Sequence, residues 1–406
     1  MQIPPFPNKK IVVITFIFAV TIMSSLFIQS CKKTESLPLV SDDEILNKFL
    51  NLPVTAFNYN VTLPLHFTTN TGGALPTSIA GLDNTPPNNL STNEGALLGR
   101  VLFYDKNLSK NGTISCGSCH LQAKGFSDSK TLSKGFLDGN TRRHSMTLIN
   151  SRFYKRGRFF WDERAATLED QVLMPFQDAV EMGMTLNEVV NTVKGKEIYP
   201  ILFKRAFGSN EINSDKISKA LAQFIRTIVS YSSKYDEGRA SAPNMEATFS
   251  NFSAEENTGK QLFIRPISNG GFGCFGCHTT EAFVSANIGP QNNGLDLATN
   301  IDNGAGETFP NNANFAGSFK TNTLRNIEIT APYMHDGRFT TLEQVIEHYN
   351  SGIKAHPNLA PALKNANGTP VRLNMSIPQK NAIVAFLKTL TDNRVTTEEK
   401  WSNPFK

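Results

Sequence analysis

The sequence has little net charge and no dense block of lysine and arginine. Its formal net charge is +5, whereas a protein that binds nucleic acid normally concentrates basic residues in a patch. Nucleic acid is therefore not an expected partner. Charged residues make up 18% and hydrophobic residues 39% of the 406 residues. This balance excludes a largely disordered chain and allows a sizeable core.

Long hydrophobic runs are scarce, and the one that matters lies at the N-terminus, where residues 11–28 are apolar and follow two lysines. This layout is typical of an export signal, with a short membrane anchor as the alternative at that length. The run ends at Ser30 and Cys31, as in a bacterial lipoprotein cleavage site. We therefore expect residues 1–30 to be a signal peptide and Cys31 to carry the lipid. An ordinary signal remains an alternative, but each reading places the chain in the periplasm, held to a bacterial membrane if lipidated.

Cysteine is scarce too, with five in the chain. Apart from Cys31, they form two C-x-x-C-H motifs, CGSCH at residues 116–120 and CFGCH at residues 274–278. Two thiols at this spacing can bind the two vinyl groups of one porphyrin, and the adjacent imidazole then binds its iron. Zinc binding and dithiol chemistry are the alternatives, but neither needs a histidine after each pair. We predict two covalently bound haem c groups, attached through Cys116, Cys119, His120, Cys274, Cys277 and His278.

The chain contains an internal repeat. Its matched segments are GRVLF at 99–103 with GKQLF at 259–263, TLIN at 147–150 with TLRN at 323–326, and WDER at 161–164 with HDGR at 335–338. The repeat predicts two related haem domains, flanked by a tether and a short tail. The expected ranges are 31–80 for the tether, 81–243 for the N-terminal haem domain, 244–395 for the C-terminal haem domain and 396–406 for the tail.

Both halves carry helix signals, so the expected fold class is mainly α, with two cytochrome c-like haem domains and long irregular loops. The signals are capping boxes at 253–256 and 341–344 and helical apolar spacing at 216–231 and 379–390. Residues 287–315 are rich in glycine and asparagine and predict a long loop.

The repeat also predicts that the two haems differ. Pro175 stands fourteen residues after Trp161, and Tyr349 stands fourteen residues after His335. Proline cannot bind iron, whereas tyrosine can. We therefore expect an open first haem and a six-coordinate second haem, unless Tyr349 is an ordinary buried aromatic residue. The competing ligands of the second haem are His348, Met334 and, more weakly, Met375.

Together these residues resemble the bacterial di-haem cytochrome c peroxidase family, including its MauG-like branch, which oxidises tryptophans of a partner protein. The resemblance covers most of residues 85–395. Besides the two haem motifs, it rests on FWD at 160–162, QVLMP at 171–175, VEM at 180–182, LRN at 324–326 and TAPYMHDGR at 330–338. It implies that peroxide reacts at the N-terminal haem while the C-terminal haem accepts electrons from a donor.

The resemblance also implies roles for three side chains of the first domain. Glu181 stands at the place of the catalytic distal carboxylate, which moves a proton between the peroxide oxygens. Gln171 stands at the companion distal position, and Trp161 at that of the aromatic relay between the haems. Without the resemblance, Glu181 would be read as a surface residue on a helix and Trp161 as part of the core.

Three departures from the ordinary peroxidases stand out. Tyr349 replaces a methionine ligand, as in the MauG-like branch, and a phenolate lowers the iron potential. Phe136 lies near the place of a displaceable histidine, so the first haem would need no reductive activation. His144 replaces an asparagine ligand of a calcium ion, although Thr330 and Pro332 match its other protein ligands. Because calcium prefers oxygen, we favour a solvent-facing or propionate-contacting His144.

The sequence thus predicts a cytochrome-c peroxidase-type oxidoreductase that reduces hydrogen peroxide to water. Its expected partner is a small redox protein, a cytochrome c or a cupredoxin, and a homodimer is an open alternative to a monomer. The rival functions are a MauG-like oxidase acting on a protein or organic substrate and a non-catalytic electron carrier. Glu181, Gln171 and Pro175 argue against the carrier, because a carrier has no use for an open, acid-lined iron.

Overall fold

The computed structural model describes Gln2 and residues 41–70, 75, 77–79, 81–286, 288–298 and 301–406. The expected signal peptide and Cys31 lie outside these residues. The chain divides into two compact units, Met1–Glu44 and Ile45–Lys406. In the part of the chain that the structure describes, no helix is long and apolar enough to cross a membrane.

The unit from Ile45 to Lys406 is helical, and its described residues include isolated β-bridges but no strand, which confirms the expected fold class. The α-helices of the first half are α3 Leu65–Thr68, α4 Asn93–Tyr104, α5 Cys116–Cys119, α6 Leu168–Gln171, α7 Met174–Gln177, α8 Leu186–Lys194, α9 Ile198–Phe207 and α10 Ser214–Arg226. The second half holds α11 Lys234–Ser241, α12 Ala254–Ile264, α13 Ala305–Thr308, α14 Leu342–Glu347, α15 Ile377–Lys388 and α16 Asn393–Thr397. Helix α2, Asp42–Phe49, crosses the boundary between the two units.

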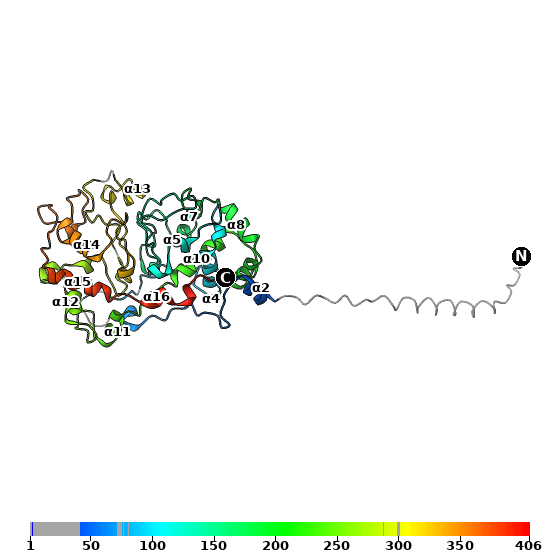
Figure 1. The fold of residues 1–406 in the computed structure, drawn as a ribbon, viewed down its shortest axis with the longest axis horizontal. Helices are drawn as coiled ribbons and strands as arrows, with labels where there is room; N and C mark the ends of the chain where they lie inside the picture. Colours follow the sequence, from blue (N-terminus) through cyan, green and yellow to red (C-terminus); the bar gives the residue numbers. More distant parts are fainter. Residues whose placement is uncertain are drawn as a thin grey trace. The chain divides into compact units, whose positions relative to one another are not determined.

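Each half has its own hydrophobic core, built around one pair of closely packed helices. In the first half α4 packs on α10, and in the second half α12 packs on α15 (Figure 1). A glycine permits both close approaches. A Cβ atom at Gly99 would lie 2.0 Å from the carbonyl oxygen of Ala220, and one at Gly259 would lie 1.8 Å from that of Ala382. Both glycines belong to the matched GRVLF and GKQLF segments.

A second matched pair of residues meets at Ser230, between the two halves. Asn150 and Asn326 both have positive φ angles, 56° and 60°, and each precedes a 3₁₀ turn. The backbone N–H of Ser230 donates to Asn150 Oδ1 (3.1 Å), and the Ser230 hydroxyl donates to Asn326 Oδ1 (2.8 Å). These matched features favour the internal repeat, which stays a prediction.

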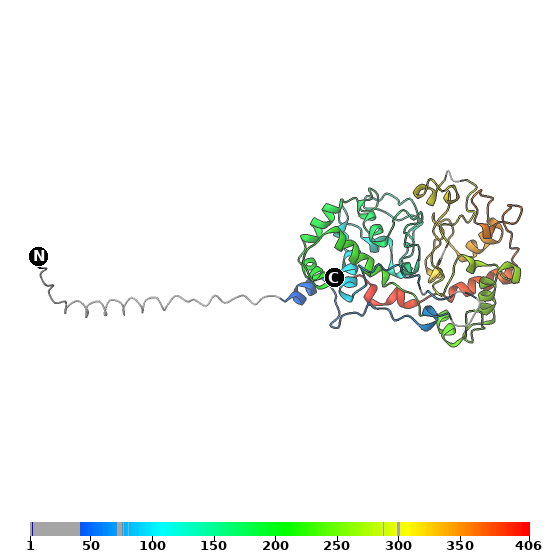
Figure 2. The same cartoon turned by 180° about the vertical axis from the view of Figure 1, so that it is seen from behind.

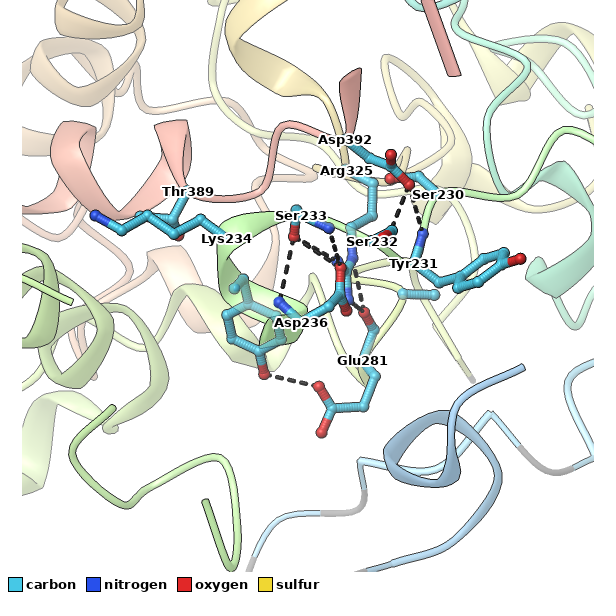
Figure 3. Close-up of polar contacts among 12 residues, drawn as sticks. Ser230, Tyr231, Ser232, Ser233, Lys234, Asp236, Glu281, Arg325, Thr389 and Asp392 are labelled. Carbon is cyan, nitrogen blue, oxygen red and sulfur yellow. Dashed lines mark hydrogen bonds and ion pairs between the residues drawn. The ribbon is translucent and has the colours of Figure 1, made fainter. Parts of the chain in front are cut away.

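A buried polar network holds residues 230–233, which lie between α10 and α11, as Figure 3 shows. Asp392 accepts hydrogen bonds from the backbone N–H groups of Tyr231 and Ser232, both at 3.0 Å. Arg325, which is fully buried, pairs with Asp236 at 2.6 Å. A buried charge is costly without a partner. The ion pair therefore holds the segment around Arg325 against α11, which carries Asp236.

The structure differs from two expected boundaries at the ends of the chain. From Ile45 onward the expected tether packs onto the body, where Leu46, Tyr59 and Phe67 are buried. The expected tail packs on α4, since Trp401 is buried and its carbonyl oxygen accepts from the Tyr104 hydroxyl (2.7 Å). Figure 2 shows the C-terminus beside α4 from the opposite side. Neither segment has the helical or alternating pattern of apolar residues that would predict this packing.

The other expected helices are present, although one of them ends earlier than predicted. Both capping boxes form, at the starts of α12 and α14, and α15 covers most of the helix expected at 379–390. Helix α10 ends at Arg226 rather than at residue 231. It ends there because Asn150 binds the backbone of residues 228 and 230, and Ile228 and Val229 are buried in the non-helical segment that follows. The described part of the expected loop at 287–315 contains only α13 and a 3₁₀ turn at Ala313–Phe315.

Candidate active site

A cavity of about 490 Å³ lies in the first half, beside the first C-x-x-C-H motif. It collects the residues predicted for the first haem from segments far apart in the chain. Its lining includes Cys116, Cys119, His120, Trp161, Gln171, Pro175 and Glu181. Phe136 is not part of this lining, because its ring packs against Gly183.

His120 is held so that one ring nitrogen is left for a metal. Its Nδ1 lies 2.9 Å from the carbonyl oxygen of Phe126. A carbonyl oxygen only accepts hydrogen bonds, so Nδ1 carries the proton and Nε2 carries the free lone pair. An imidazole oriented in this way by a backbone carbonyl is typical of metal-ligating histidines.

The four cysteines of the two motifs form no disulfide. Burial raises the pKa of Cys116 to about 12 and that of Cys119 to about 11. Burial likewise raises the pKa of Cys274 to about 12. Thiol–disulfide exchange needs a thiolate, so this environment is poor for dithiol redox chemistry. The described residues contain no cluster of three or more His, Cys, Asp or Glu side chains arranged for a metal ion.

A second cavity, of about 550 Å³, lies beside the second motif. Its lining includes Cys274, Cys277, His278, Met334, His335 and Tyr349. His278 repeats the arrangement of His120, since its Nδ1 lies 3.1 Å from the carbonyl oxygen of Asn322. Its Nε2 is therefore also left for a metal.

The candidates for the distal side of the second cavity can be ranked by where they lie. Tyr349 lines the cavity from the π-helical segment His348–Gly352, which continues α14. His348 does not line it and has its Nε2 3.0 Å from the carbonyl oxygen of Asn293. Met334 lines the cavity, with its sulfur accepting from Asn293 Nδ2 at 3.5 Å, whereas Met375 is buried elsewhere. Single-turn π segments are frequent at functional sites, and this one favours Tyr349.

Glu181 lies in the turn between α7 and α8, with its side chain in the lining of the first cavity. The surface helix that the sequence alone suggested is therefore wrong. Burial raises the pKa of Glu181 to about 7, with a further contribution from the nearby Asp178, while Arg164 opposes the shift. Two hydrogen bonds hold the Glu181 backbone. Its N–H donates to Asp178 Oδ1 (3.0 Å), and its carbonyl oxygen accepts from the Phe136 N–H (3.0 Å). A carboxyl group with such a pKa can both accept and donate a proton near neutral pH.

The two cavities share a wall. Its residues, which line both cavities, are His144, Ser145, Met146, Thr147, Trp161 and Lys320. The Trp161 indole N–H donates to the carbonyl oxygen of His144 (2.8 Å), and its ring lies edge-on to the His335 ring at 6.4 Å. Trp161 is thus part of the wall between the cavities rather than of a remote core.

His144 is buried, with 4% of its surface exposed, so the solvent-facing reading is wrong. Its Nε2 lies 3.1 Å from the Ser127 hydroxyl, and its Nδ1 lies 3.1 Å from the carbonyl oxygen of Lys130. Thr330 and Pro332 both line the second cavity. A calcium ion held by them stays a prediction.

Part of the shared wall, notably Met146 and Lys320, was not predicted from the sequence. Neither residue belongs to a motif or to an amphipathic helix. Their positions, just before the matched TLIN and TLRN segments, are the one feature of the sequence that points to them.

The family model for di-haem cytochrome c peroxidases matches residues 93–242. The methylamine utilization protein MauG of Methylorubrum extorquens is 34% identical over 310 residues, which cover 75% of this chain and 80% of that protein. This chain belongs to the di-haem cytochrome c peroxidase family. The cytochrome c551 peroxidase of Nitrosomonas europaea is also 34% identical, over 306 residues that cover 74% of this chain and 80% of that peroxidase.

Solved structures in the family have the same fold. A MauG-like protein associated with microbial copper homeostasis is 30% identical, with a TM-score of 0.71, and the match covers 85% of this chain and 99% of that chain. The diheme peroxidase BthA from Burkholderia thailandensis, at 22% identity and a TM-score of 0.62, shares the fold over 85% of this chain and 99% of its own.

Membership of the family implies two haem c groups, and the residues fit them. Each cavity offers two cysteine thiols that form no disulfide and one imidazole whose Nδ1 is hydrogen-bonded to a backbone carbonyl. In the first cavity Cys116, Cys119 and His120 would hold the porphyrin. Their counterparts in the second cavity are Cys274, Cys277 and His278.

Proposed function

We propose that this protein is a peroxidase that reduces hydrogen peroxide to water in the first cavity, with electrons entering through the second. The observation that carries this proposal is that Glu181, Gln171 and Pro175 line the same cavity as His120. Pro175 cannot bind iron, so the iron of the first haem would stay open to peroxide. Glu181, whose carboxyl group titrates near neutral pH, can supply the proton that peroxide needs as its O–O bond is cleaved.

Glu181 is the proton-transfer group in this proposal. In its carboxylate form it accepts a proton from one oxygen of hydrogen peroxide and delivers it to the other, which leaves as water. After this transfer, the remaining oxygen takes up two protons from solvent and two electrons, so that the products are two molecules of water. When bound, the first haem supplies the iron at which the O–O bond is cleaved. Gln171 orients the peroxide by hydrogen bonding through its side-chain amide.

Trp161 carries electrons between the two sites. Its indole borders both cavities and is fixed by its hydrogen bond to the carbonyl oxygen of His144. Tyr349 would bind the iron of the second haem, since it lines the second cavity. A phenolate ligand stabilises ferric iron, so the second site would operate at a lower potential than one with a thioether.

A second candidate function is oxidation of a partner protein or organic substrate, as in a MauG-like oxidase. Tyr349 in the second cavity favours it, as does the 34% identity to a protein named MauG. The electron-transfer partner distinguishes the two. For the peroxidase it is a reduced cytochrome c or cupredoxin, and for the oxidase it is the substrate itself.

The experiment is stopped-flow absorbance of the purified di-haem protein mixed with peroxide, with and without a reduced cytochrome c or cupredoxin. Rapid, repeated oxidation of the donor supports the peroxidase. A long-lived oxidised state that ignores both donors supports the oxidase. If the protein did not react with peroxide in any redox state, electron transfer without catalysis would be the remaining function.

We further propose that the protein is exported and anchored by a lipid on Cys31. The support is the N-terminal apolar run that ends at this cysteine. Replacing Cys31 with serine is expected to abolish incorporation of labelled palmitate in cells and to release the protein from the membrane fraction. Retention in that fraction would favour an uncleaved anchor.

A further inference from the structure

Lys320 is a buried cation in the wall between the two cavities. Only 8% of its surface is exposed, and it lines both cavities. Its backbone N–H donates to the carbonyl oxygen of Trp161 (2.8 Å), and Asn322, two residues later, accepts from His278. The Lys320 segment is therefore fixed on one side to the proposed relay and on the other to the proximal histidine of the second site.

Lys320 has no carboxylate partner in the described part of the chain, and this sets it apart from the arginines of the first cavity. Those arginines are all paired, Arg143 with Asp162 (2.6 Å) and Asp302 (2.7 Å), Arg164 with Asp162 (3.2 Å), and Arg142 with Glu307 (2.7 Å). The ammonium group of Lys320 instead lies over the aromatic rings of Tyr154 (4.3 Å) and Phe159 (4.9 Å).

A buried ammonium group without a counterion is costly, because its hydration is lost and contact with aromatic rings replaces only part of it. Burial accordingly lowers the pKa of Lys320 to about 8. The charge of Glu163 opposes this shift, but that carboxylate is already bound by Arg156 (2.8 Å) and by the Tyr154 hydroxyl. The ammonium group of Lys320 therefore lacks a negatively charged partner at the wall of the two cavities.

We propose that Lys320 binds a propionate carboxylate of one of the two haems at the wall between the cavities. A haem carries two such carboxylates, and they are the anions that the family's cofactors would bring to this place. A charge-assisted hydrogen bond in a site of low dielectric constant is stronger than one in water. The inference rests on the family's two haems but not on the reduction of peroxide, so the peroxidase proposal can fail without it.

Lys320 then raises the reduction potential of the haem whose propionate it binds. Reduction adds an electron to the haem, and a nearby positive charge stabilises that electron. Lys320→Met removes the charge and keeps most of the volume. It is expected to lower one midpoint potential by about 59 mV, which corresponds to a tenfold change in the one-electron equilibrium constant.

Spectroelectrochemical titration of the purified di-haem protein, without peroxide, measures both midpoint potentials. A fall for the first haem alone assigns the propionate to the first haem, and a fall for the second alone assigns it to the second. Lys320→Arg, which keeps the charge, is expected to restore most of the potential. Mass spectrometry and pyridine haemochrome spectra establish that both haems remain attached.

Lys260→Met is the matched control. Lys260 is also buried, and its ammonium group donates to the carbonyl oxygen of Met245 (2.9 Å), but it lines neither cavity. Its loss is expected to lower the melting temperature without moving either potential. Two unchanged potentials in Lys320→Met, or the same shift in Lys260→Met, would overturn the proposal.

Lys320→Met can also fail to mature. In that event resonance Raman spectra of the wild-type protein and of Lys320→Arg decide the question. A propionate bending mode that shifts between these two proteins supports the contact, and identical propionate modes would overturn it.

Discussion

The indole N–H of Trp161 donates to the carbonyl oxygen of His144 at 2.8 Å, and both residues line both cavities. This hydrogen bond fixes the one tryptophan of the site in the wall that separates the two C-x-x-C-H motifs. An aromatic ring held between two redox sites is well placed to shorten the path of an electron between them. In the proposed function, Trp161 is therefore the residue whose loss would separate the two sites.

Trp161→Phe is expected to leave both haems attached and to slow electron transfer between them. Loss of the indole hydrogen bond is also expected to cost about 1 kcal/mol of stability. Rapid-mixing spectroscopy of the half-reduced protein measures the transfer rate. An unchanged rate would show that electrons bypass Trp161. Trp401→Phe controls for loss of a tryptophan as such, because Trp401 is buried at the end of the 3₁₀ turn Glu399–Trp401, packs against α4 and lines neither cavity.

The pH dependence of peroxide turnover is expected to follow Glu181. Its pKa of about 7 means that the carboxylate, the form that accepts a proton from peroxide, becomes dominant as the pH rises through that value. The kcat/KM for peroxide is therefore expected to rise with pH up to about 7 and then to level off. A profile without an inflection in this range would argue that another group takes the proton.

The same shift affects stability with the opposite sign. Because the pKa of Glu181 in the folded protein, about 7, exceeds the ordinary value of about 4.3, the folded state holds this proton more tightly. Its contribution to stability is fully present below the ordinary pKa and is lost as the pH rises through about 7. Denaturation midpoints on either side of neutrality are expected to differ less in Glu181→Gln than in the wild-type protein.

Tyr349→Phe is expected to change the absorption and EPR spectra of the second haem without detaching it, because phenylalanine cannot bind iron. His348→Gln is the matched control, since the His348 ring lies outside the cavity lining. If the spectra of Tyr349→Phe matched those of the wild-type protein, Met334 would become the preferred ligand.

The two helix pairs give a prediction about packing. Gly99→Ala and Gly259→Ala would each force a Cβ atom against a backbone carbonyl, at 2.0 Å and 1.8 Å in the present structure. Each is expected to destabilise the protein by about 1–3 kcal/mol, measured by thermal denaturation of the haem-loaded protein. Gly195→Ala, where a Cβ would meet its nearest neighbour at 3.5 Å, is expected to be nearly neutral.

The fold class and many of the residues that line the two cavities could be predicted from the sequence, because short sequence motifs mark them. The C-x-x-C-H motifs, the capping boxes and the spacing that placed Pro175 and Tyr349 all lie within short segments. The shared wall lacks such a signature. Lys320 and Met146 become neighbours of both sites only through long-range packing, for which no periodic pattern exists.

The ends of the chain were harder to predict for the same reason. Trp401 is buried because its carbonyl and ring meet α4 and Thr227, residues far away in the sequence. Helix α10 ends early because the side chain and backbone of Asn150 bind the segment after it. In both cases a tertiary contact overrides what the local sequence favours.

The most direct test of the proposed function is the rate of peroxide consumption by Glu181→Gln, measured with reduced donor in the stopped-flow apparatus. Loss of a general acid–base group typically slows the reaction by about 10²–10⁴-fold, and we expect a loss in that range with both haems in place. Glu94→Gln, at an exposed position on α4, is expected to react like the wild-type protein. If Glu181→Gln consumed peroxide at the wild-type rate, the proposed role of the first cavity in proton transfer would be wrong.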